Sequence, residues 1–250
     1  MRIEIVTVFP EYFASPLRSS MVARAAGKGL VEYAVHDLRE YATDRHRSVD
    51  DTPYGGGGGM VFRPEPVFQA WEALGLAEAH CVYLTADGAA FTQDAAVRLS
   101  RLPRLVLLCG HYKGIDERIR GRLIDEEISI GDYVLTGGEP AACVVLDAVV
   151  RLLPGVLGDF ESALEDSFQD GVLDCPWYTR PAEFDGQAVP QVLRDGDHRQ
   201  VRAWRRRQAL RRTFERRPEL LARAALDDEE ERLVARWRQE AQFNNLIGTE

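Results

Sequence analysis

The chain has 250 residues, of which 45% are hydrophobic and 28% charged, as is ordinary for a globular protein. It contains no run of about 18 uncharged apolar residues, and its first residues lack a small-residue cleavage site, so neither a membrane span nor a signal peptide is predicted. The formal net charge of −9 argues by itself against a nucleic-acid partner.

Apolar strand-like runs alternate with helical patterns up to Pro154. Because the strand-like runs are almost continuously apolar, they indicate a parallel sheet covered on both faces, that is, an α/β domain. The predicted strands are 2–8, 31–38, 80–86, 104–110 and 126–131, and the predicted helices are 10–26, 65–74, one that opens at Thr92, 114–123 and 139–153.

The character of the chain changes after Pro154. The next segment is acidic, rich in glycine and proline, and without clear periodicity, whereas the residues from Asp197 onward have a helical pattern. We therefore predict three parts, which are an α/β domain at 1–158, an interdomain linker at 159–170 and a small C-terminal all-helical domain at 171–250.

The four cysteines are scattered along the chain without paired C-x-x-C spacing. This pattern predicts reduced thiols in a cytoplasmic protein and gives no reason to expect zinc. The cysteines are Cys81, Cys109, Cys143 and Cys175.

The segment 199–217 is strongly basic. It holds nine arginines against Glu215 alone, so it carries +8 and the rest of the chain −17. At helical spacing most of its arginines fall on the face opposite Val201, Trp204 and Leu210. A solvated face is the simplest interpretation, but a basic face on an acidic chain with few interleaved acids favours contact with a polyanion.

Five consecutive glycines occupy residues 55–59. Such a run is costly in backbone entropy, and it is not a phosphate-binding P-loop because Met60 and Val61 follow it in place of Lys-Ser/Thr. A linker also fits poorly, because the strand and helix pattern continues on both sides. The run therefore predicts a loop where a ligand approaches bare backbone, with Asp50 and Asp51 as nearby acceptors.

Three further loops, 83–91, 108–116 and 128–142, follow predicted strand ends and are rich in glycine. In open α/β sheets ligands gather at the carboxyl ends of strands, so three such loops indicate one composite site for a nucleotide-sized molecule, although any one of them could be only a tight turn. None contains G-x-G-x-x-G, which disfavours a dinucleotide fold.

Six motifs along the chain resemble, in order and spacing, those of the bacterial tRNA (guanine-37-N1)-methyltransferase family of the SPOUT superfamily. The resemblance extends to about Leu221. The motifs are "DRHRSVDDTPYGGGGGM", "LCGHYKGIDERI", "ISIGDYVLTGGE", "RLLPGVLG", "EDSFQDGVLDCPWYTRP" and "VLRDGDHRQVRAWRRRQALRRTFERRPELL".

The resemblance implies a fold and a function. It implies a parallel α/β sheet with a deep trefoil knot, a homodimer with active sites at its interface, and a C-terminal domain that holds the tRNA anticodon arm. The implied reaction moves a methyl group from S-adenosylmethionine to N1 of guanosine 37. The implied cofactor contacts are Tyr83, Leu84, Thr85, Gly110, Tyr112, Gly114, Ser129, Ile130, Gly131, Asp132, Tyr133, Val134, Leu135, Gly137 and Gly138.

Chemistry at N1 of guanine needs a base, because this nitrogen carries a proton at neutral pH, and a cation or donor near O6. The residues alone leave Glu161, Glu165, Asp166 and Asp170 as candidate bases. The resemblance selects Asp166 as the base and Arg151, which alone could be an ordinary helix-end cation, as the stabilising group. The implied RNA contacts are Asp50, Gly55, Gly56, Gly57, Gly58, Gly59, Arg199, Arg202, Arg205 and Arg206.

The chain departs from the family pattern at three positions. Gly58 stands where a proline is usual, Pro140 comes one position early, and Lys113 stands where some relatives have glutamate. Lys113 offers no carboxylate to a Mg²⁺ ion, and a metal requirement is left open. Two alternatives also stay open, namely a non-catalytic RNA-binding protein and a SPOUT enzyme that methylates the ribose 2′-OH.

Overall fold

The computed structural model describes residues 1–157 and 166–247, and the side chains up to Phe243. By its internal contacts the chain divides into two compact units, Met1–Phe160 and Glu161–Glu250, and each is described here by itself. In the described residues no helix is both long and apolar enough to cross a membrane.

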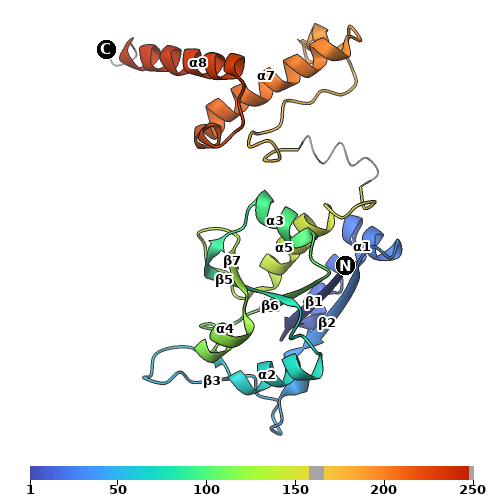
Figure 1. Cartoon of the computed structure of the whole chain (residues 1–250), viewed down its shortest axis with the longest axis vertical. Helices are drawn as coiled ribbons and strands as arrows, with labels where there is room; N and C mark the ends of the chain where they lie inside the picture. Colours follow the sequence, from blue (N-terminus) through green and yellow to red (C-terminus); the bar gives the residue numbers. More distant parts are fainter. Residues whose placement is uncertain (158–165, 248–250) are drawn as a thin grey trace. The chain divides into compact units, whose positions relative to one another are not determined.

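The first unit is built on a five-stranded sheet with the order β2-β1-β6-β5-β7 (Figure 1). All four strand pairings are parallel, which confirms the α/β prediction. Because the strands run in one direction, their carboxyl ends all lie at the same edge. The strands are β1 (Arg2–Thr7), β2 (Glu32–Asp37), β5 (His80–Ala90), β6 (Arg104–Cys109) and β7 (Glu126–Ser129).

Helices cover both faces of this sheet (Figure 1). On one face lie α1 (Ser20–Gly27), α3 (Gln93–Ser100) and α5 (Glu139–Val150), whose apolar side chains share one core cluster with β1 and β6. On the other lie α2 (Pro64–Ala73) and α4 (Glu117–Leu123), which share a second cluster with alternate residues of the same strands. The near-continuous apolar strands follow from this two-sided burial.

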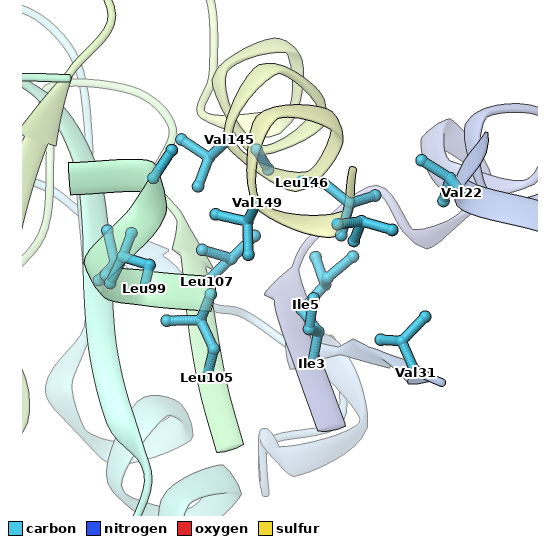
Figure 2. Packing of buried hydrophobic residues seen from close by; sticks show 14 of the residues in the cluster. Ile3, Ile5, Val22, Val31, Leu99, Leu105, Leu107, Val145, Leu146 and Val149 are labelled. Carbon is cyan, nitrogen blue, oxygen red and sulfur yellow. The ribbon is translucent and has the colours of Figure 1, made fainter. Parts of the chain in front are cut away.

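The first cluster shows how α5 sits on the sheet. Ile5 and Leu107 point up from β1 and β6 toward Val145, Leu146 and Val149 of α5 (Figure 2). All five are at most 1% exposed. This packing fixes the first turn of α5, whose residues reach the carboxyl edge of the sheet.

The prediction of one helix over 10–26 is wrong. The structure has two short 3-10 turns, Pro10–Phe13 and Pro16–Arg18, before α1 begins. Pro16 has no N–H to donate to a preceding turn, so a continuous helix cannot pass through it without a lost hydrogen bond. Ser20, with φ +52°, marks a further break.

One carboxylate, Glu4 of β1, is completely buried in the sheet. Burial alone would raise its pKa, but hydrogen bonds from His36, Arg104 and Arg2 outweigh that effect and the pKa is lowered. A lowered folded-state pKa stabilises the fold above the ordinary carboxyl pKa, and this contribution is lost as the pH falls through the folded-state value.

The second unit contains two long helices, α7 (His198–Arg216) and α8 (Asp228–Ile247). It is not all-helical as predicted, because β8 (Glu183–Phe184) and β9 (Gln187–Ala188) form a small antiparallel hairpin. Leu210, Thr213 and Trp237 are buried between these helices and the segment 172–175. Asp197 caps α7 by accepting from the N–H groups of residues 199 and 200. The predicted apolar face of the arginine-rich helix thus packs inward.

Candidate functional site

A pocket of about 210 Å³ lies at the carboxyl ends of β5, β6 and β7. Its walls come from β5 residues 83–87, where the pairing with β7 is interrupted, from the glycine-rich loops that follow β6 and β7, and from the start of α5. This is the edge at which ligands bind in open parallel sheets. The prediction of a loop over 83–91 is wrong, because β5 continues to Ala90, but this segment and the other two predicted loops do line one cavity.

The pocket is lined by all of the cofactor residues that the resemblance implies except Asp132. Further residues line it that were not predicted. They are Ala86, Asp87, His111, Lys113, Arg120, Ile128, Thr136 and Ala141.

Gly138 shows why one wall of the pocket needs a glycine. Its N–H donates to the carbonyl of Gly110 at 2.8 Å, so the loop before α5 lies directly on the loop after β6. A Cβ at this position would lie 2.8 Å from Cα of Cys109, which is backbone and cannot swing away. Any side chain here would force the two loops apart.

A buried polar chain that sequence reasoning missed holds the same two loops. Nε2 of His111 lies 2.8 Å from Oε2 of Glu139, and the hydroxyl of Thr7 donates to Oε1 of Glu139 at 2.6 Å. Glu139 is 2% exposed and stands in the first turn of α5, where the helix dipole favours a negative charge. These hydrogen-bonded side chains therefore connect β1, the loop after β6 and α5, and the His111 ring lines the pocket.

Arg120 and Tyr83 form a second polar part of the pocket wall. The Arg120 guanidinium lies 5.3 Å from the centre of the Tyr83 ring and donates to Glu127 and Asp87, each at 3.0 Å. Burial raises the pKa of Tyr83 even though this guanidinium acts in the opposite direction. Tyr83 thus stays a neutral hydrogen-bonding phenol.

The glycine run is attached to the pocket at its far end. The N–H of Lys113 donates to the carbonyl of Met60 at 2.9 Å, and the N–H of Phe62 donates to Gly114 at 3.0 Å. Gly59, with φ +93°, lies against the Lys113 stem, so a Cβ there would come within 2.8 Å of Cγ. The loop therefore ends beside two residues that line the pocket.

Asp50 is brought to the same place. It lies in β3 (Asp50–Asp51), pairs with Phe62 of β4 (Val61–Phe62), and stands next to Tyr112 of the pocket wall. Burial, reinforced by the Asp50 carboxylate, raises the pKa of Tyr112. Asp50 and the glycine run thus form a rim on one side of the pocket.

The two predicted catalytic residues belong to different units. Arg151 follows the last residue of α5 and caps it, donating its N–H to the carbonyl of Asp147 at 3.2 Å. Asp166 belongs to the second unit and is half-buried there. Two other candidate bases, Glu161 and Glu165, lie outside the described residues.

The arginines of α7 do different things. Arg199 and Arg202 are exposed, whereas Arg205 lies over the ring of Trp177 at 4.3 Å. Arg206 is paired with Glu230 of α8 at 2.7 Å and therefore helps to hold the two helices together. Among the described residues, no group of three or more His, Cys, Asp or Glu side chains is placed to hold a metal ion.

Comparison with known proteins decides the family. Residues 1–223 match the family model described as "tRNA (Guanine-1)-methyltransferase TrmD". The chain belongs to this family. Three proteins named "tRNA (guanine-N(1)-)-methyltransferase" are similar to it. That of Chlorobaculum tepidum is 55% identical over 89% of this chain and 98% of its own length. The proteins of Brevibacillus brevis and Dictyoglomus turgidum are 52% and 49% identical over 96% of this chain and 99% and 98% of their lengths.

The family match includes both the pocket and the basic helix. It covers all five strands of the sheet, α5 and the whole of α7, and it ends before α8 begins. Three polar residues at the pocket of this methyltransferase-family chain were not predicted from the sequence. They lie inside or beside the quoted motifs and are His111, Arg120 and Glu139. The available signal for His111 and Glu139 was a polar side chain within a predicted glycine-rich loop, whereas Arg120 lies in the predicted helix 114–123 and had no such signal.

Proposed function

We propose that the chain transfers a methyl group from S-adenosylmethionine to N1 of guanosine 37 of tRNA, beside the anticodon. The observation that carries this proposal is the family match over residues 1–223 together with a pocket at the carboxyl ends of β5, β6 and β7. The named relatives support N1 of guanine in tRNA, and position 37 rests on the motif resemblance.

The residues of the pocket fit S-adenosylmethionine. Gly110, Gly137 and Gly138 line the pocket without side chains, so an adenine ring can approach their backbone closely, and Asp87 provides an acceptor for hydroxyl or ammonium groups. The bound molecule supplies an electrophilic methyl group. The family's trefoil knot is part of this proposal and rests on the motif resemblance.

The chain's own residues prepare the nucleophile. Asp166 accepts the N1 proton of the guanine, and the Arg151 guanidinium stabilises the negative charge that then develops toward O6. Asp50 and the glycine run hold the edge and face of a guanine that has left the stack, because bare backbone can approach a flat base closely. Their position on the rim of the pocket supports this assignment.

The remaining assignments follow the same reasoning. We assign cofactor binding to 1–158, a linker to 159–170 and the tRNA anticodon arm to 171–250, where Arg199 and Arg202 offer exposed cations. We also propose a cytoplasmic homodimer. The dimer rests on the motif resemblance.

Substitution of Gly59 tests whether the backbone conformation of the glycine run is needed for methylation of tRNA. Gly59→Ala is expected to lower kcat/KM for tRNA about tenfold, because a left-handed φ is costly for alanine and the new methyl group meets Lys113. Gly27→Ala at the end of α1 is the control, since Gly27 is exposed and does not line the pocket, its φ is not left-handed, and its Cβ would meet open space. Equal kinetics for the two variants would contradict the assigned role of Gly59.

The activity itself is tested with labelled S-adenosylmethionine and two tRNA transcripts that differ only at position 37, one with guanosine and one with adenosine. We expect label in the guanosine transcript alone. Equal labelling of both would refute the specificity, and no labelling of either would refute the activity.

A further inference from the structure

We propose that the second unit carries a stacking platform for an unpaired base of the tRNA, built from Trp177 and Tyr178. This inference rests on the proposed function, because it assumes an RNA ligand. It adds a binding site to a surface that the family match and the catalytic assignments leave unexplained.

Two neighbouring aromatic residues are unusually exposed. Trp177 is 57% and Tyr178 49% exposed, although each also contacts α7. Tyr178 packs against Trp204, with 6.3 Å between ring centres, and Trp177 lies under the Arg205 guanidinium. A large aromatic ring that is held in place on one side and open on the other resembles the surface on which RNA-binding proteins stack bases.

The rings border a cavity of about 700 Å³. Arg180, Arg194 and Arg205 line it, and its described lining contains no carboxylate, on a chain whose net charge is −9. The positive charge of these arginines favours an anionic partner, and the flat aromatic rings favour a partner with planar groups. An unpaired nucleotide has both, since its phosphate faces the arginines while its base stacks.

The platform is rigidly attached to the basic helix. Arg212 donates from Nη1 to the carbonyls of Asp174 and Cys175 at 3.0 and 2.9 Å, and the N–H of Leu173 donates to the Thr213 hydroxyl at 2.8 Å. The indole N–H of Trp177 donates to Asp174 at 2.5 Å. Because the ring is already oriented, a base would bind with little loss of side-chain entropy.

Arg205 takes a different part in this arrangement from Arg199 and Arg202. Its guanidinium already covers one face of Trp177, so it neutralises phosphate while also supporting the ring from behind. A base on the open face would complete a three-layer stack. The geometry thus explains why an arginine of the basic helix lies over an aromatic ring.

The test uses the full-length protein and measures the Kd for a guanosine-37 tRNA transcript by anisotropy. Trp177→Ala is expected to weaken binding about tenfold, in line with the loss of one stacked base, whereas Trp177→Phe keeps most of the affinity. Phe184→Ala is the control, because Phe184 is an aromatic residue that is more exposed than Trp177, at 75% against 57%, and does not line the cavity.

A second measurement separates stacking from a structural role. Transcripts with one abasic nucleotide at each anticodon-loop position in turn are titrated against the wild type and Trp177→Ala. At one position, we expect removal of the base to weaken wild-type binding about tenfold and binding by Trp177→Ala hardly at all. This non-additivity is the result expected when the base and the Trp177 ring contact each other directly.

Several results would overturn the platform. Unchanged tRNA affinity of Trp177→Ala, or an equal loss of affinity in Phe184→Ala, would contradict it. So would the absence of any abasic position coupled to Trp177. Loss of the dimer by Trp177→Ala on size exclusion would show that the surface is a subunit contact. Absence of any tRNA binding by the wild type would also overturn it. If label transfer fails while the Trp177 coupling persists, the methylation proposal fails and the platform stands; the reverse pattern removes only the platform.

Discussion

Replacing Asp166 with asparagine is expected to lower kcat for methylation by about 10² to 10⁴-fold, the range in which a positioned general base acts. Asparagine keeps the size of the side chain but cannot accept the N1 proton. Because the residue belongs to the second unit and the cofactor pocket to the first, the Kd for S-adenosylmethionine should stay within about twofold of the wild-type value. Single-turnover kinetics and calorimetric titration measure the two effects separately.

Asp170→Asn is the control for this prediction. Asp170 was an equal candidate from the residues alone, lies four positions further on, and is exposed. We expect near-normal turnover from it. Loss of cofactor affinity in Asp166→Asn, or equal loss of turnover in both variants, would show that Asp166 is structural.

Gly138→Ala is expected to weaken S-adenosylmethionine binding about 100-fold, because displacement of positioned groups by about 1 Å has effects of this size. The added methyl group would lie 2.8 Å from Cα of Cys109 and 3.1 Å from N of Gly110, so the two loops that face each other across the pocket wall must separate. Calorimetric titration with S-adenosylmethionine measures the loss, and a lowered Tm should accompany it.

Gly121→Ala is the control for this prediction, and its expected change in Tm has the opposite sign. Gly121 is exposed within α4, and a Cβ there would meet nothing within 4 Å. Alanine in a helix interior is more stable than glycine by about 0.5–1 kcal/mol, so this variant should keep its cofactor affinity and show a slightly higher Tm. Normal cofactor binding by Gly138→Ala would contradict the account of the pocket wall.

The sequence predicts the central strands of the first unit well because β1 and β6 are buried on both faces and therefore appear as apolar runs. In the run 105–109 every side chain is fully buried, so every position is apolar. The same reasoning fails at 10–26, where the helical pattern was read across Pro16. There the local backbone restriction outweighs the periodicity.

The site was predictable in its backbone and less so in its side chains. Glycine-rich strand ends indicate where a ligand binds, so the sequence predicts the segments that line the pocket. Which side chains of these segments contact one another depends on the tertiary structure. The contact of His111 with Glu139, which are 28 positions apart, and the pairing of Arg206 with Glu230 depend on how helices and loops fold back on one another. No spacing rule gives those contacts.

Nucleoside mass spectrometry of the methylated tRNA tests the central claim most directly. After reaction with S-adenosylmethionine, a guanosine-37 transcript is digested and its methylated nucleoside identified and mapped to its position. We expect 1-methylguanosine at position 37 and at no other position. A 2′-O-methylated nucleoside, a different methylated base, or 1-methylguanosine elsewhere in the tRNA would contradict it.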